Sequence, residues 1–293
     1  MNGSTCLDNP WAPGSKDLSF DRVITAVSGN QITVDAPIVN ALDKEFGGGV
    51  VYKYTLDGRL QQVGVENLRG DSEFASPTDE MHGWNFIDVG VVMNGWVRDI
   101  TAVHFGYAAV TVVARSKWVT VQDSTSIEPV SMITGGRRYS FNVDDSQMVL
   151  YQRCTSTDGR HSFVEGSNVP GPNVFLDSRE TRGHADIGPH HRWSAGGLFD
   201  NIVSDNQINV RNRGNSGTGH GWAGANMVIW NSVASGLLVQ NPPGAQNWVI
   251  GCKGTKTGNG IVDADGSPVW PRSLYLEQLR ERLGPAAVQA IGR

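Results

Sequence analysis

The residues best suited to chemistry are arginines and histidines in the middle of the chain. No lysine lies between Lys117 and Lys253, whereas nine arginines and five of the seven histidines do. A guanidinium is a planar fork that can hold a carboxylate or sulfate by two parallel hydrogen bonds, which lysine cannot do. Histidine has an ordinary pKa near 6.5 and can accept or donate a proton at neutral pH. This stretch therefore predicts acid–base chemistry on an anion.

Four short motifs carry these residues: GRRY (136–139), GRH (159–161), GPHHRW (188–193) and GHGW (219–222). Each precedes a short apolar segment by 8 to 13 residues. If those segments are strands of successive coils, the motifs form one column that spans about 15 Å, the length of a few sugar rings. We predict catalytic roles for His161, Arg160, Arg138, Tyr139 and His220. We predict substrate binding by Arg137, His190, His191, Arg192, Trp193 and Trp222, since sugars stack on flat aromatic faces.

Short apolar, β-type segments recur along the chain and predict its fold. They cover residues 96–100, 118–121, 148–151, 174–176, 198–202, 228–230 and 248–250, with starts 20 to 30 residues apart. Repetition at this period indicates a stacked array. Amphipathic helical segments are absent between them, and hairpin signals are weak, which disfavours helical solenoids and propellers. We predict an all-β fold, a right-handed parallel β-helix (a solenoid), over residues 1–270.

The two ends of the chain differ from this repeat. Residues 18–70 are predicted to form early coils with a hairpin excursion, in which 20–27 and 31–35 are strands joined by the turn at 28–30. Residues 271–293 are predicted to be a short C-terminal helical tail or cap. Leucines at helical spacing mark a helix over 274–283, Ser273 can cap it, and Gly284-Pro285 ends it. We expect this tail to plug the open end of the coils.

Composition excludes several classes. The net charge of −5 argues against a nucleic-acid partner. No apolar run is long enough for a membrane span, and no signal peptide opens the chain. The three cysteines are far apart, which favours buried free thiols and leaves one disulfide possible. Hydrolase-elbow, zincin and phosphate-loop motifs are absent.

The repeated strand pattern over residues 60–260, together with GRRYSF (136–141), GRHSFV (159–164), GPHHRW and GHGWAG (219–224), resembles the secreted bacterial right-handed β-helix proteins of the pectate-lyase-like superfamily. The resemblance implies a secreted or periplasmic enzyme that cleaves a polysaccharide in a groove along the coils. Classical pectate lyases also use calcium held by an acidic cluster, and the sequence places no such cluster in register.

The leading hypothesis is a lyase that cleaves an acidic, uronate-containing polysaccharide by β-elimination. Arg138 and Arg160 would neutralise the carboxylate, His161 would be the base, and Tyr139 or His220 the acid. His190 and Arg192 would line a neighbouring subsite. The predicted partner is thus an anionic polysaccharide, without a cofactor.

Four alternatives stay open. A glycoside hydrolase would use two carboxylates drawn from Asp158, Glu165, Asp186 and Asp200. A non-catalytic β-helix could simply bind glycans. A divalent metal such as Ca²⁺ or Zn²⁺ could be held by His161, His190, His191 and His220. Finally, the arginines could be structural and pair with Asp144, Asp145, Asp158 or Asp186; His184, outside the column, is predicted to be structural.

Overall fold

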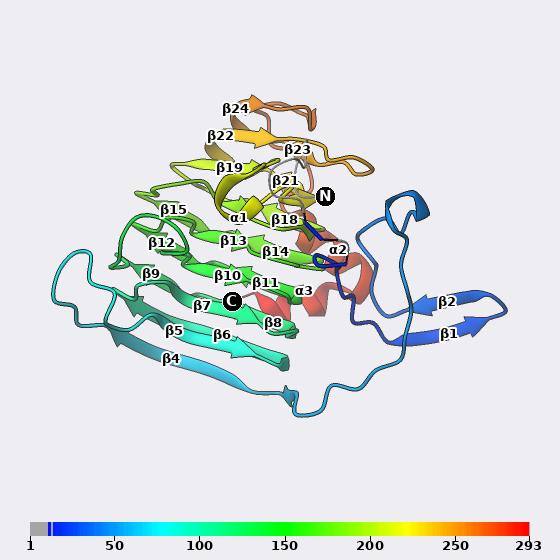
Figure 1. Ribbon diagram of the computed structural model, residues 1–293, viewed down its shortest axis with the longest axis horizontal. Helices are drawn as coiled ribbons and strands as arrows, with labels where there is room; N and C mark the ends of the chain where they lie inside the picture. Colours follow the sequence, from blue (N-terminus) through cyan, green and yellow to red (C-terminus); the bar gives the residue numbers. More distant parts are fainter. Residues whose placement is uncertain (1–10, 13, 293) are drawn as a thin grey trace.

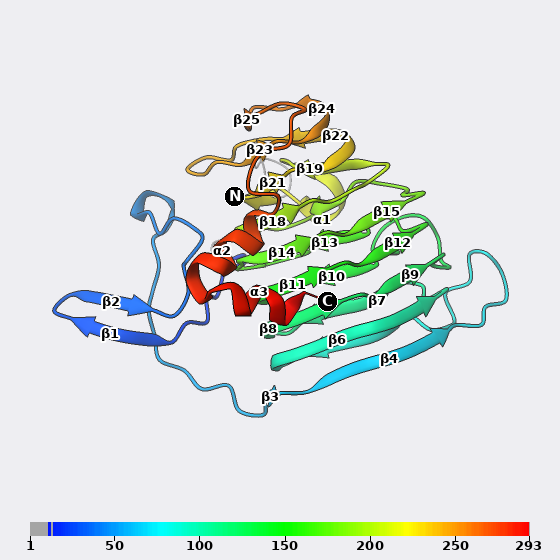
Figure 2. The ribbon, with the colours of Figure 1, turned by 180° about the vertical axis from the view of Figure 1, so that it is seen from behind.

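The protein is mostly β, with parallel sheets and a few short helices. The computed structural model describes residues 11, 12 and 14–292, and Figures 1 and 2 show it from opposite sides. Strands account for 41% of it and helices for 8%, which confirms the β-dominated class.

The strands form two large sheets and three small ones (Figure 1). The five-stranded sheet has the order β16 (Gly188–Pro189), β13 (Phe163–Glu165), β10 (Phe141–Val143), β7 (Ala108–Val113), β5 (Asn85–Gly90). The thirteen-stranded sheet contains β15 (Arg179–Thr181), β12 (Thr155–Thr157), β9 (Thr125–Ile127), β6 (Val92–Val103), β8 (Lys117–Gln122), β11 (Gln147–Gln152), β14 (Asn173–Leu176), β18 (Gly197–Asp200), β21 (Val228–Trp230), β23 (Trp248–Ile250) and β25 (Ile261–Asp263), with β3 (Leu60–Gln61) and β4 (Gly64–Asp71) beside β6. The small sheets are β1 (Ile24–Ser28) with β2 (Gln31–Val34), β17 (Ser194–Ala195) with β20 (Gly224–Ala225), and β19 (Gln207–Val210) with β22 (Val233–Val239) and β24 (Lys253–Thr257). The helical segments are a 3₁₀ turn at Lys44–Phe46, α1 (Ser216–Gly219), α2 (Leu274–Leu283) and α3 (Pro285–Ile291).

All seven predicted strands lie side by side in the thirteen-stranded sheet. They belong to β6, β8, β11, β14, β18, β21 and β23, each paired in parallel with the next. Val174 faces Leu198, Leu198 faces Val228, and Val228 faces Trp248. The apolar segments that repeat in the sequence are therefore the strands that pair, one after another, in this sheet.

The chain turns at one corner on successive passes, immediately after these strands. The corner residues have φ between 46° and 68° and are Asp123, Arg153, Asp177, Asn201, Asn231 and Gly251. Asp, Asn and Gly tolerate this left-handed conformation better than other residues. Each corner amide donates to a carbonyl of the following pass, as Asn201 does to Trp230 and Asn231 to Ile250. The corner thus connects neighbouring passes as well as bending the chain.

The residue after the corner points inward, and two of the cysteines occupy this column. Cys154 and Cys252 are buried and free, and Ser178 and Ser232 are the buried equivalents on other passes. The prediction of buried free thiols is confirmed for these two, and Cys6 lies outside the described residues. The core beside them is a ladder of stacked rings, with Phe175 5.1 Å from both Tyr151 and Phe199.

The N-terminal hairpin is confirmed, and it projects from the sheets (Figure 1). Both of its strands, β1 and β2, are almost fully exposed. Its base is anchored by Asp21, which forms an ion pair of 2.7 Å with Arg59 and one of 3.6 Å with the buried Lys117. Within residues 18–70, the strands that pair with the thirteen-stranded sheet are β3 and β4.

The C-terminal helices occur where predicted, but they do not plug an end. Ser273 caps α2 by accepting from the Leu276 amide, as expected. Figure 2 shows α2 and α3 lying along the flank of β11, β14 and β18, away from the terminal strands β4 and β25. The reason is polar anchoring: the buried Asp200 carboxylate accepts from the Ser273 hydroxyl at 2.7 Å and from the Tyr275 amide at 2.9 Å. The expectation of an end cap was wrong.

We expect Asp200→Ala to loosen this tail. The change removes both hydrogen bonds at the start of α2, so it should cost about 1–3 kcal/mol of stability and speed proteolysis after residue 270. Arg272→Ala is the control, because its ion pair with Asp177 is exposed and should contribute at most about 1 kcal/mol. Equal cleavage rates for the two variants would show that Asp200 does not hold the tail.

Candidate functional site

Three of the predicted motifs border strands of the five-stranded sheet. Phe141, Val143 and Phe163 belong to the core cluster, so the alternating residues Asn142 and Val164 face the other way. Tyr139 precedes β10, and His161 precedes β13. His190 and His191 follow β16, and His220 follows α1. Neighbouring strands of one sheet therefore bring these side chains together.

Four histidines form one contact group, here called the imidazole cluster: His161, His190, His191 and His220. The ring centroids of His161 and His190 are 4.2 Å apart. Those of His190 and His220, and of His191 and His220, are 5.2 Å apart. Tyr139 lies 5.0 Å from His161 and 5.5 Å from His190. The structure thus assembles five of the residues predicted from the sequence.

Depth divides the cluster into two pairs. His161 is only 2% exposed and His190 6%, whereas His191 and His220 are partly exposed. Gly217 makes room for the outer pair, because its φ is 57° and a Cβ there would lie 2.4 Å from Cε1 of His220. A polymer could reach His191 and His220, but His161, the base predicted from the sequence, is covered.

Hydrogen bonding fixes the tautomer of His161. Its Nδ1 contacts the backbone carbonyl of Asp186, which can only accept, so Nδ1 carries the proton and Nε2 the lone pair. That Nε2 is buried and has no hydrogen-bond partner among the described residues. The same holds for Nδ1 of His190, His191 and His220.

The imidazoles are neutral at physiological pH. Burial lowers the pKa of His191 and His220 to about 4; the next cause is Arg192 for His191, and His191 followed by Arg192 for His220. The pKa of His161 is also about 4, for the same leading reason. That of His190 lies lower still, again because of burial. Neutral imidazoles can act as bases and as metal ligands.

Positive charge surrounds the cluster. Arg213 is paired with Asp186, but Arg160, Arg192 and Arg211 form no ion pair within the described part of the chain. The Nη1 of Arg160 donates to the Gly135 carbonyl at 2.5 Å, and the Nε atoms of Arg192 and Arg211 are buried without a partner there. Three guanidiniums thus lack a carboxylate, which suits the site to an anionic ligand.

Two predicted arginines are engaged elsewhere. Arg137 holds Glu80 through two hydrogen bonds of 2.7 and 2.9 Å. Arg138 is 6% exposed and donates to the Asp158 carboxylate at 3.0 Å and to the Ser131 carbonyl at 2.8 Å. Its fork is therefore not available to a substrate carboxylate, and the structural alternative describes Arg138 better.

The two tryptophans predicted to bind substrate lie outside the imidazole cluster. Trp193 and Trp222 are partly exposed, without a ring contact to the imidazole cluster among the described residues. His184 contacts Asp158 at 2.9 Å, as its predicted structural role requires. Arg211 and Arg213 were not singled out from the sequence. Their alternating positions just after β19 were the available signal, because residues two apart on a strand share a face.

The carboxylates offered for a hydrolase are not free. Asp186 is paired with Arg213 and Asp158 with Arg138. Glu165 and Asp200 are 0% exposed. The structure offers more support for a metal site. His161, Asp186 and His190 each place one possible ligand atom within 4.8 Å of the others.

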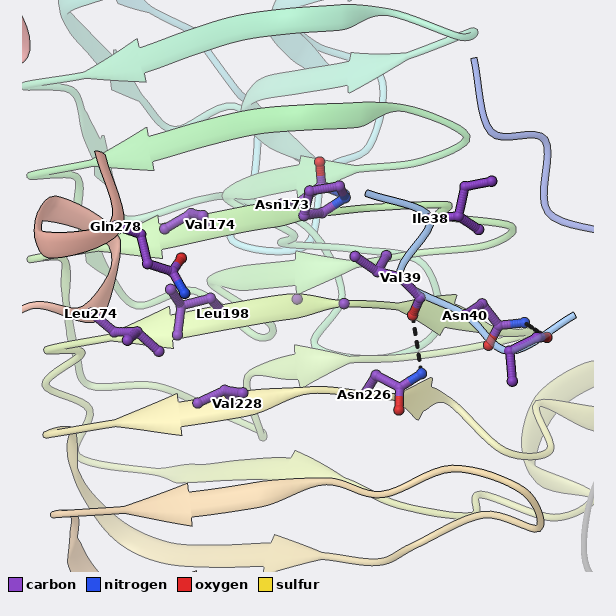
Figure 3. A pocket seen from close by; sticks show the side chains of 14 residues that line it. Ile38, Val39, Asn40, Asn173, Val174, Leu198, Asn226, Val228, Leu274 and Gln278 are labelled. Carbon is purple, nitrogen blue, oxygen red and sulfur yellow. Dashed lines mark hydrogen bonds between the residues drawn. The ribbon is translucent and has the colours of Figure 1, made fainter. Parts of the chain in front are cut away.

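A groove of about 560 Å³ lies elsewhere, on the thirteen-stranded sheet between residues 38–41 and α2. Figure 3 shows Val174, Leu198 and Val228 on its floor, Leu274 and Gln278 on one side and Val39 on the other. No ionisable side chain lines it, so it supplies no acid–base chemistry.

No protein-family model, curated protein or solved structure matches this chain. Among the described residues, no helix is both long and apolar enough to cross a membrane.

Proposed function

We propose that the protein is a polysaccharide lyase that cleaves an anionic, uronate-containing polymer at the imidazole cluster. The observation that carries the proposal is the placement of neutral imidazoles beside the guanidiniums of Arg160 and Arg192, which form no ion pair among the described residues. We also propose that the parallel sheets wind as a right-handed β-helix. The regular corner after each strand supports this reading, as does the resemblance to the pectate-lyase-like superfamily. A secreted or periplasmic location is proposed with it, because such polymers lie outside the cytoplasm.

β-Elimination needs a neutralised carboxylate, a base for the adjacent proton and an acid for the leaving oxygen. Arg160 keeps its place in the proposed carboxylate clamp and Arg192 replaces Arg138, since neither Arg160 nor Arg192 forms an ion pair in the described chain. His220 replaces His161 as the proposed base, because its ring is accessible and neutral.

Tyr139 remains the proposed acid; its side chain is only 5% exposed, so its hydroxyl would have to be uncovered when the polymer binds. Burial raises the pKa of its hydroxyl, against the opposing influence of Arg160, so the hydroxyl stays protonated at neutral pH. As the C–H bond breaks, its electrons form the double bond, the C–O bond breaks, and Tyr139 protonates the departing oxygen. Arg160 would stabilise the resulting tyrosinate.

The alternatives lack comparable support. A hydrolase would need two available carboxylates about 5 to 9.5 Å apart, and the four acids proposed for that role are paired or buried. A purely glycan-binding protein would not need buried neutral bases, although it would use the same arginines. The binding and cleavage measurements below separate these functions.

We expect binding to favour uronate polymers over neutral glycans and to weaken steeply as salt is added. The reason is that Arg160, Arg192 and Arg211 would pair with polymer carboxylates, and such pairs are screened by salt. Calorimetry at several ionic strengths measures the binding. A screen of the same polymers for the ultraviolet absorbance of an unsaturated product measures cleavage. Salt-independent binding of a neutral glycan would contradict the proposal, whereas uronate binding without product would favour a glycan-binding protein.

A further inference from the structure

The buried half of the imidazole cluster has the composition of a metal site. His161, Asp186 and His190 each bring one possible ligand atom within 4.8 Å of the other two. The rings of His161 and His190 are in contact, with centroids 4.2 Å apart, and both are almost fully buried. Two imidazole nitrogens and one carboxylate oxygen thus converge from the segment before β13, the segment after β16 and the loop between β15 and β16.

The lone pair of His161 is available for such a role. The Asp186 carbonyl fixes the proton on Nδ1, which leaves Nε2 as a buried acceptor with no partner among the described residues. Metal-bound histidines commonly have their second nitrogen fixed by a carbonyl in this way. Nδ1 of His190 is buried and equally without a partner there.

Asp186 supplies the charge that a cation needs. Arg213 is paired with its carboxylate and holds that side chain in position beside the two histidines. A carboxylate can accept from a guanidinium through one oxygen and bind a metal through the other. The ion pair therefore orients the third ligand and still leaves it able to bind.

We infer that His161, Asp186 and His190 bind a divalent transition-metal ion beneath the accessible imidazoles. Ligand sets rich in imidazole nitrogen favour ions such as zinc, cobalt, iron or nickel over calcium, magnesium and manganese, which prefer oxygen ligands. Bond lengths of about 2.0–2.2 Å require the donors to approach to about 3 Å, which small side-chain rotations can provide. The metal site depends on these three residues alone; any role of the metal in cleavage rests on the proposed lyase function.

The positive charge around the site predicts that an anion affects metal binding. Arg160, Arg192 and Arg211 would repel a bare cation, so an anion bound among them should strengthen metal binding. Because coupling between two ligands is reciprocal, the metal should strengthen binding of a uronate by the same factor. Monomeric glucuronate is a suitable anion, and uncharged glucose is its control.

Cobalt(II) is the probe, added to the full chain after chelator treatment and dialysis. We expect one ion per chain, visible d–d absorption, and tighter binding with glucuronate but not with glucose. His190→Gln and His161→Gln should weaken binding at least tenfold, with Asp186→Asn in the same direction. His184→Ala should bind as the wild type does, because His184 lies outside the imidazole cluster and contacts Asp158. Melting curves identify any variant that does not fold. If His161→Gln or Asp186→Asn does not fold, the cobalt(II) affinity of His190→Gln decides whether the metal site exists.

The inference is overturned if the wild type takes up no cobalt(II), or if folded His190→Gln binds it as tightly as the wild type. Product formation is scored separately from metal binding. Cobalt(II) binding that is lost in His190→Gln while no polymer yields an unsaturated product keeps the metal site and removes the lyase. Unsaturated product from a wild-type chain that binds no cobalt(II) keeps the lyase and removes the metal site.

Discussion

Replacing His220 by alanine is expected to lower the turnover of a uronate polymer by about 10²–10⁴-fold, the usual loss when a general base is removed. Polymer binding should largely survive, because the arginines that hold the carboxylate are unchanged. The pKa of His220 is lowered to about 4 by burial and by neighbouring cationic groups, so its base form persists in mildly acidic solution. The wild-type kcat/KM should therefore stay high down to about pH 5 and fall below that. The measurement is the rate of ultraviolet absorbance increase against pH.

His184→Ala is the matched control for this prediction. His184 is an exposed histidine that contacts Asp158 and lies outside the imidazole cluster, so turnover should be unchanged. Arg160→Ala should differ from both, because losing a clamp arginine weakens binding and rate together. Near-wild-type turnover by a folded His220→Ala would contradict the assignment of the base, and release of saturated ends would contradict the lyase class.

Much of the fold could be predicted because its pattern is local and periodic. Strands such as Val228–Trp230 are short apolar runs closed by a residue that tolerates positive φ, here Asn231. A residue of this kind ends the strand on each pass, so the spacing of the strands in the sequence was enough to predict that Val174, Leu198 and Val228 lie side by side. The position of the tail could not be read in this way. Nothing near Ser273 indicates that its partner is Asp200, 73 residues earlier.

The candidate site was predictable in position but not in the roles of its residues. Comparable offsets to a repeated strand, of 8 to 13 residues, predicted that Tyr139, His161, His190 and His220 would lie together, and they do. Burial and pairing depend on residues distant in the sequence. In the sequence, Arg138 and Arg160 occur in similar motifs. In the structure, Arg138 forms an ion pair with Asp158, whereas Arg160 forms no ion pair with an acid among the described residues. Residue type therefore indicated which chemistry to consider, whereas the availability of each side chain could be seen only in the structure.

Glu165 should make the stability of the protein fall as the pH rises, and Glu165→Gln should abolish that contribution. Its carboxyl is 0% exposed, and both oxygens lack a hydrogen-bond partner among the described residues. It lies in the interior, where a Cβ on Gly197 would be 2.6 Å from Oε1. Burial raises its pKa from 4.5 to about 8, against small opposing effects of Ser194 and Asn173.

The direction of this effect follows from proton linkage. Below pH 4.5, the folded and unfolded chains both hold the Glu165 proton, so pH has no effect through this group. Between pH 4.5 and about 8, only the folded chain holds it, and stability falls by about 1.4 kcal/mol per pH unit. Above pH 8 both states have released the proton and the loss is complete. Glutamine has nearly the same shape and no such proton, so its advantage over the wild type should grow to on the order of 3–5 kcal/mol by pH 8.

Urea unfolding of the two chains from pH 5 to pH 9 measures this difference, and all other titrating groups cancel because both chains contain them. Glu180→Gln provides a graded control. Glu180 is also buried, but it accepts from the Ser204 hydroxyl at 2.6 Å, and its pKa is raised only to about 7. Its difference curve should therefore level off about one pH unit earlier and at a smaller value. Parallel stability curves for wild type and Glu165→Gln would mean that Glu165 is ionised in the folded protein. In that case the interior behind His190, whose amide donates to the Glu165 carbonyl, would have to stabilise a charge.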